Sequence, residues 1–118
     1  MGAPVAFFEI ISGDHDHARR FYADLFGWTA EADPAMGGYA LVDTGNGDTA
    51  VGGGIGPSSD DDGPGVRIYM RVGDLEGHLD RVEKLGGTRL VPPMDLPSGY
   101  GRIAVFADPD GNRVGLWS

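Results

Sequence analysis

Two stretches of the chain repeat each other, one starting at Phe7 and the other at Arg67, 60 positions later. Residues 7–14 read Phe-Phe-Glu-Ile-Ile-Ser-Gly-Asp, and residues 67–74 read Arg-Ile-Tyr-Met-Arg-Val-Gly-Asp. Each run ends at Gly-Asp before a helical pattern, which predicts a strand that leads into a helix. Because the offset is about half of the 118 residues, the repeat predicts two similar modules that close on each other, not a solenoid.

The charge balance and the residue types limit the classes of partner. The 18 acidic residues against 9 Lys and Arg give a net charge of −9 and a pI near 4.5. This charge repels nucleic acid and anionic membranes and favours either solubility or a cationic ligand.

There is no cysteine, which excludes disulfides and thiolate chemistry. No apolar run approaches the roughly 20 residues of a membrane helix, and no leader pattern precedes the first strand. We therefore expect a cytoplasmic protein.

The first module is predicted over residues 1–56. Residues 4–11 form a mostly apolar run bounded by a proline and by Ser-Gly-Asp, as a buried strand does. Asp14 is placed to cap a helix that ends at Gly27. The further strands expected in this module are 28–32, 39–43 and 49–55, with a hairpin turn at 45–48.

The second module is predicted over residues 66–118, after a Gly-, Pro- and Asp-rich linker at 57–65. Asp74 should cap its helix, whose inward face is expected to contain Leu75, Leu79, Val82 and Leu85. The remaining strands are expected at 88–91, 102–107 and 113–117, and Pro92-Pro93 should end the first of them. The fold class is therefore α+β: two βαβββ modules in tandem that form a curved mixed sheet around a cavity, with the helices outside.

Strand alternation predicts which side chains face away from the helices. The side chains expected on the helix side are Phe8, Ile10, Ile68, Met70 and Val72. Glu9, Arg67, Tyr69 and Arg71 then project from the opposite faces. A buried carboxylate needs a cation or several donors, so Glu9 should pair with Arg67 or Arg71. Such a pair either closes the floor of the barrel, or it orients a polar ligand or exchanges a proton with one. The residues alone leave both readings open.

Several motifs in both modules together carry a family resemblance. They are Phe8-Glu9-Ile10, Asp14, Ala18, Phe21-Tyr22, Leu25-Phe26-Gly27-Trp28, Leu85-Gly86-Gly87 and Phe106-Ala107-Asp108-Pro109-Asp110-Gly111-Asn112. In this order the sequence resembles the vicinal oxygen chelate superfamily, which holds the glyoxalases, the bleomycin- and fosfomycin-resistance proteins and the extradiol dioxygenases. The resemblance implies paired βαβββ modules around a cavity and, for a single-domain member, a homodimer.

The resemblance also implies where the metal enzymes of this superfamily place their four ligands. Those positions fall on Phe7, Gly53, Arg67 and Gly115. None offers an imidazole or a carboxylate, and Arg67 would repel a divalent cation. The sequence therefore predicts no metal and no other cofactor.

Other groups of polar residues do not suggest a different site. His15, Asp16 and His17 begin a helix, where residues two apart point to different sides. His78 stands alone on the second helix. Residues 108–112 lack the spacing and the closing glutamate of a calcium loop and predict a hairpin turn.

The leading hypothesis is a metal-independent protein that binds an organic small molecule in the cavity between the modules. The expected ligand contacts are Phe7, Glu9, Arg67, Tyr69, Arg71 and Trp117, which combine apolar walls with a few polar groups. The acidic composition favours a cationic ligand. An alternative is a metal-free isomerase or lyase that uses Glu9 as its catalytic acid or base. A third hypothesis is a metalloenzyme of glyoxalase or dioxygenase type with relocated ligands.

Overall fold

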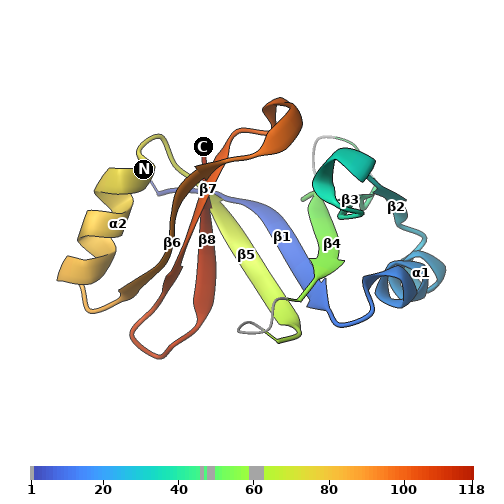
Figure 1. The fold of residues 1–118 in the computed structure, drawn as a ribbon, viewed down its shortest axis with the longest axis horizontal. Helices are drawn as coiled ribbons and strands as arrows, with labels where there is room; N and C mark the ends of the chain where they lie inside the picture. Colours follow the sequence, from blue (N-terminus) through green and yellow to red (C-terminus); the bar gives the residue numbers. More distant parts are fainter. Residues whose placement is uncertain (1, 46, 48–49, 59–62) are drawn as a thin grey trace. The chain divides into compact units, whose positions relative to one another are not determined.

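A computed structural model of the protein describes residues 2–45, 47, 50–58 and 63–118, which form two compact units (Figure 1). One unit is Phe7–Arg67, and the other combines the N-terminal residues up to Ala6 with Ile68–Ser118. Both units follow the order strand, helix and three strands, so the predicted α+β fold with two βαβββ modules is confirmed. The predicted hairpin at 45–48 and linker at 57–65 lie partly outside the described residues, as does the start of the strand expected at 49–55.

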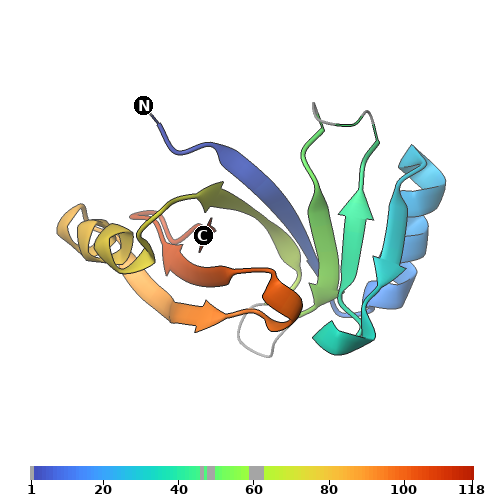
Figure 2. The same ribbon diagram turned by 90° about the horizontal axis from the view of Figure 1, so that it is seen from above.

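The unit Phe7–Arg67 is a four-stranded sheet with one helix. Its elements are β1 (Val5–Ser12), α1 (His15–Phe26), β2 (Thr29–Ala32), η1 (Pro34–Met36), β3 (Ala40–Asp43) and β4 (Gly53–Pro57). The strand order is β2-β3-β4-β1; β1 and β4 are parallel, and the other pairs are antiparallel. The helix α1 packs against β2 and β4 (Figure 2).

The ends of α1 follow the signals in the sequence. The Asp14 carboxylate accepts a hydrogen bond from the backbone N–H of His17 at 3.1 Å. Gly27 has φ 72° and donates its N–H to the carbonyl of Ala23. A left-handed residue closes a helix in this way at little cost only when it is glycine. Both predicted caps are confirmed.

The unit that contains residues 68–118 has the same organisation. Its elements are β5 (Gly65–Arg71), α2 (Leu75–Lys84), β6 (Thr88–Asp95), η3 (Pro97–Gly99), β7 (Arg102–Ala107) and β8 (Arg113–Trp117). The strand order is β5-β8-β7-β6, and β5 runs parallel to β8. The Asp74 carboxylate caps α2 by accepting from the N–H of Gly77 at 3.0 Å, as predicted.

The strand β6 contradicts the expectation that Pro92-Pro93 would end it. It continues to Asp95 and pairs with β7 on both sides of the prolines, with register shifts between Arg89 and Met94. Proline cannot donate to a strand ladder, but it is tolerated in edge strands and at bulges. Because β6 is the edge strand of its unit, the prolines produce an irregular strand instead of stopping it.

The two helices cover separate clusters of apolar residues. Below α1, Ile10, Val42 and Ile55 pack with Phe8 and Tyr22. Below α2, the buried cluster is Val72, Leu75, Leu79, Ala104 and Leu116, with Met70 and Phe106 packed against it. The predicted helix-facing sides of the first strand and of Met70 and Val72 are therefore confirmed. Leu85 was expected on the inward face, but it is the C-cap residue and 72% exposed. Ile68, which was also expected on the helix side, is 39% exposed.

No helix among the described residues is long and apolar enough to cross a membrane.

A glycine on the inner strand β8 makes room for an aromatic ring. Tyr69 on β5 lies opposite Gly115 on β8 and is only 4% exposed. A Cβ atom on Gly115 would overlap the ring of Tyr69. Gly115 is therefore required by packing against Tyr69, and its φ lies outside the left-handed region.

We expect Gly115→Ala to lower the free energy of unfolding by about 1–3 kcal/mol, the usual cost of overpacking a filled core. Urea denaturation measures this change. Gly73→Ala is the matched control, because a Cβ there meets no atom within 4 Å. In a Tyr69→Ala background the additional cost of Gly115→Ala should largely disappear. An equal cost in both backgrounds would show that the ring is not the cause.

Candidate functional site

Glu9 is a mostly buried carboxylate in the middle of β1. It lies opposite Gly54 on β4, and its side chain is 14% exposed. Its neighbours Phe8 and Ile10 belong to the apolar cluster below α1. Alternation therefore directs Glu9 to the other face of the sheet, as predicted.

Tyr39, at the entry to β3, supplies a hydrogen bond to Glu9. Its hydroxyl donates a hydrogen bond to Glu9 Oε2 at 2.7 Å. A Cβ on either Gly54 or Gly56 would overlap the ring of Tyr39. These two glycines lie on the same face of β4, so the ring rests on a strip of backbone without side chains. The glycines thus determine where the phenol can lie, and the phenol oxygen reaches Glu9.

Arg67, near the start of β5, supplies a positive charge. Its Nη1 lies 3.7 Å from Glu9 Oε1, and its side chain is 8% exposed. The carboxylate thus faces a phenol donor at one oxygen and a guanidinium at the other. Of the two predicted partners, Arg67 and Arg71, the structure pairs Arg67 with Glu9 within the unit Phe7–Arg67.

Arg71 makes a different contact, in the other unit. Its guanidinium carbon lies 4.4 Å from the centroid of the Trp117 ring, a cation–π contact. The Trp117 Nε1–H donates to the carbonyl of Tyr100 at 2.8 Å, which fixes the plane of the ring. Among the predicted ligand contacts, the structure thus pairs Glu9 with Arg67 and Arg71 with Trp117.

Comparisons with known proteins assign the chain to a family. Residues 5–116 match the model of the Glyoxalase/Bleomycin resistance protein/Dioxygenase superfamily. The chain belongs to this superfamily. The anthracycline biosynthesis protein DauV of Streptomyces sp. (strain C5) is 38% identical over 98% of this chain and 46% of its own length. The putative glyoxylase CFP32 of Mycobacterium bovis is 31% identical over 88% of this chain and 41% of its own length. The chain thus spans less than half of either relative.

Solved structures of the superfamily share the fold. Methylmalonyl-CoA epimerase from Mycobacterium tuberculosis superposes with a TM-score of 0.65, covering 96% of this chain and 85% of that one. The sequence identity is 22%, so this likeness concerns the fold alone.

Three of the four positions at which the superfamily resemblance implies metal ligands have other roles in this chain. A Cβ on Gly53 would overlap the ring of Phe8, and one on Gly115 would overlap that of Tyr69. Arg67 is committed to Glu9. Within the described part of the chain, no group of three or more His, Asp or Glu side chains could hold a metal ion. The donors present therefore do not fit the metal site that the resemblance implies.

Tyr39 was missed by the sequence analysis, although a signal for it exists. Glycines at 54 and 56 alternate on one face of a strand, so that face lacks side chains over two consecutive positions. A buried strip of this kind must be filled by a large residue from a neighbouring strand. Tyr39 is the aromatic residue that enters the adjacent strand β3, and the pairing of β3 with β4 brings it there.

We expect Tyr39→Phe to lower the free energy of unfolding by about 1.5–3 kcal/mol, because it removes a hydrogen bond to a mostly buried charged group. Chemical denaturation at neutral pH measures the loss. Tyr22→Phe is the matched control; its ring stacks on Trp28, and its change should stay within about 0.5 kcal/mol. Equal losses in the two variants would contradict the importance of the bond between Tyr39 and Glu9.

Proposed function

We propose that the chain is a metal-independent small-molecule-binding protein whose ligand contacts Glu9, Tyr39 and Arg67. The observation that carries the proposal is the Glu9 carboxylate, which is 14% exposed and holds both a phenol donor and a guanidinium. Taking such a group from water is costly. Besides stabilising each other, the three groups offer a ligand an acceptor, a hydroxyl and a cation within one unit. The other ligand contacts are still predictions: Phe7, Tyr69, Arg71 and Trp117.

The ligand chemistry follows from the charges of this site. The formal charges of Glu9 and Arg67 balance, so the pair favours a ligand with hydroxyl or carbonyl groups. The net charge of −9 favours a cation. The relative DauV is described as an anthracycline biosynthesis protein. A polycyclic ligand with hydroxyl and carbonyl groups, with or without an amine, is therefore our first candidate.

An amine-bearing anthracycline and its sugar-free aglycone test the proposal as a pair. We expect at least one to bind with a dissociation constant in the micromolar range and to raise the melting temperature, because a ligand that binds only the folded state stabilises it. Titration calorimetry in the presence of EDTA measures the affinity. Tighter binding of the amine would favour a cationic ligand, and equal affinities would favour the polycyclic body.

The variants for this test separate the site from the surface. Glu9→Gln should weaken binding about tenfold or more, since it removes a charged acceptor and unbalances Arg67. Glu31→Gln, on the exposed part of β2, is the matched control. Binding that disappears in EDTA and returns with a divalent cation would overturn metal independence. Failure of both probes and of a wider library of small molecules would overturn the proposal.

A second candidate is a metal-free isomerase or lyase with Glu9 as its acid or base. The observation that favours it is the distance of 2.7 Å between the Tyr39 hydroxyl and Glu9, which is short enough for proton exchange. In such a reaction Glu9 takes a proton from the carbon next to a carbonyl, and the electron pair moves to the carbonyl oxygen. Arg67 would stabilise the negative charge on that oxygen. Protonated Glu9 then returns a proton to the same carbon.

Methylmalonyl-CoA is the first substrate to test, because its epimerase shares the fold. If the second candidate holds, we expect NMR to detect solvent deuterium at the carbon between the carbonyls, with a rate that survives EDTA. Glu9→Gln should reduce that rate at least about a hundredfold, the scale of general-base catalysis. Exchange at an unchanged rate in this variant would remove Glu9 from the mechanism.

A further inference from the structure

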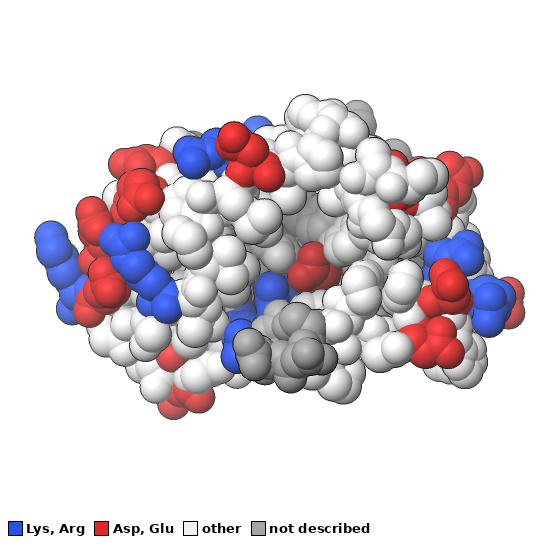
Figure 3. All heavy atoms as spheres, in the orientation of Figure 1, with Lys and Arg blue, Asp and Glu red and all other residues white. Residues whose placement is uncertain are grey.

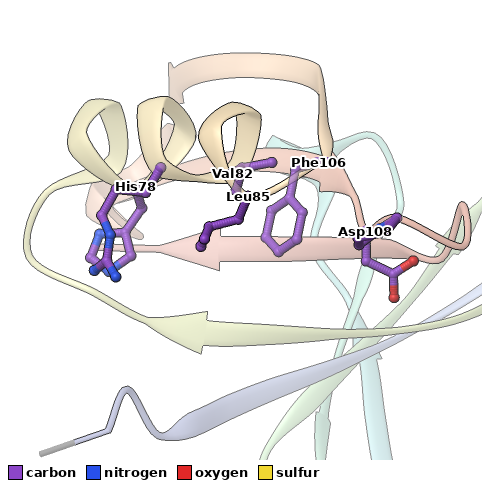
Figure 4. A pocket seen from close by; sticks show the side chains of 8 residues that line it. His78, Val82, Leu85, Phe106 and Asp108 are labelled. Atoms are coloured by element: carbon purple, nitrogen blue, oxygen red, sulfur yellow. The ribbon is translucent and has the colours of Figure 1, made fainter.

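A groove separate from the Glu9 site lies in the other unit, between α2 and the end of β7. Its volume is about 320 Å³. Figure 4 shows Val82, Leu85 and Phe106 between His78 on one side and Asp108 on the other. This volume is at the lower end of the range of small-molecule pockets. The groove therefore has an apolar middle with polar groups at its ends.

The apolar middle of the groove is open to water. Leu85 is 72% exposed, although it is a large apolar side chain beside the buried Leu79 cluster. It caps the C-terminus of α2, where the chain turns into Gly86 with φ 101°. The turn thus holds Leu85 at the rim of the groove, where it could cover one side of a bound apolar group.

Charged side chains of both signs lie over α2 (Figure 3). The acidic side chains of this helix form ion pairs with Arg89. Arg89 on β6 contacts three carboxylates of the helix: Glu76 at 3.2 Å, Glu83 at 2.9 Å and Asp80. Its hydrogen bonds to Glu83 and Glu76 raise the pKa of Arg89 above its ordinary value. In the described part of the chain no ion pair involves Arg81, which lines the groove. Because Arg89 holds these acids, Arg81 keeps an available positive charge.

Asp108 at the far side is occupied by its own turn. Its Oδ1 accepts from the N–H groups of Asp110 and Asn112, each at 2.9 Å, and its Oδ2 accepts from the Asn112 side chain at 2.8 Å. The side-chain bond from Asn112 contributes most to holding the pKa of Asp108 below its usual value. A carboxylate with these three donors is a poor partner for a ligand cation.

One ring nitrogen of His78 is already used at the start of α2, so Arg81 is the better anchor for an anion. Its Nδ1 lies 2.8 Å from the carbonyl oxygen of Asp74. A carbonyl can only accept, so Nδ1 carries the proton, and in the neutral ring Nε2 is an acceptor. The guanidinium of Arg81 can hold a carboxylate with two parallel hydrogen bonds, whereas His78 has only one ring nitrogen left for a ligand.

We propose that this groove binds a small organic carboxylate with an aromatic or alkyl body, with the carboxylate held by Arg81 and the body lying against Leu85 and Phe106. This ligand site is separate from the proposed site at Glu9. The groove has a sufficient volume, an apolar lining and the available guanidinium of Arg81. Its carboxylate, Asp108, is hydrogen-bonded within its own turn.

4-Phenylbutanoate and 4-phenylbutanamide test the proposal, since they share an apolar body and differ in the charge. We expect the carboxylate to bind the full chain about tenfold more tightly than the amide, the scale of one charged hydrogen-bonding group. Amide NMR shifts, followed in ¹⁵N-labelled protein, should change at residues 78–87 and 106–108. Shifts confined to the surroundings of Glu9 would overturn the proposal.

Three exposed variants complete the test without disturbing the core. Arg81→Gln should remove the preference for the carboxylate, and the matched control Lys84→Gln, one turn along α2, should keep it. Leu85→Ser should weaken both probes alike. An unchanged preference in Arg81→Gln would overturn the proposal. So would shifts in α2 that depend on protein concentration alone, because they would identify the groove as an interface between copies of the chain.

Discussion

Buried glycines on the inner strands of the two units are the constraint on which most of the structure depends. Gly54 and Gly56 on β4 lie under the ring of Tyr39, and Gly115 on β8 lies under the ring of Tyr69. Interiors are packed to crystal-like density, so a side chain at these glycines would displace a ring. The same glycines determine the chemistry, because they place the hydroxyl of Tyr39 on Glu9 and leave no ligand atom at Gly115.

The attraction between Glu9 and Arg67 has to be compared with the cost of taking both charges from water. Taking both charges from water costs several kcal/mol for each ion, and their attraction at 3.7 Å offsets part of this cost. The bond from Tyr39 at 2.7 Å offsets a further part. A pair of well-packed apolar residues would fill the same space without this cost. That a carboxylate and a guanidinium are nevertheless placed there is the physical reason for preferring a binding role to a purely structural one.

The sequence predicted what depends on local chemistry and on alternation. The caps at Asp14, Gly27 and Asp74 follow from backbone groups within one turn of the helix, and the directions of Phe8 and Ile10 follow from the period of a strand. What it missed depends on neighbours distant along the chain. The continuation of β6 through its prolines depends on its being an edge strand, and the role of Tyr39 depends on the pairing of β3 with β4. The exposure of Leu85 follows from where α2 ends, which periodicity alone does not fix.

The two copies of the repeat fill the space over a buried glycine in different ways, and the difference creates the candidate site. Glu9 and Tyr69 occupy equivalent positions, and each lies opposite a buried glycine of the parallel strand, Gly54 or Gly115. In the second unit Tyr69 covers its glycine with its own ring. The side chain of Glu9 has no ring to do so, and Tyr39 covers Gly54 from the neighbouring strand. The volume is filled in both cases, but only in the first unit does the filling ring bring a hydroxyl to a carboxylate.

On the helix side, by contrast, the equivalent residues Ile10 and Met70 are both apolar and both pack below their helices. The repeat therefore keeps the face that stabilises the fold and differs on the face that can bind a ligand.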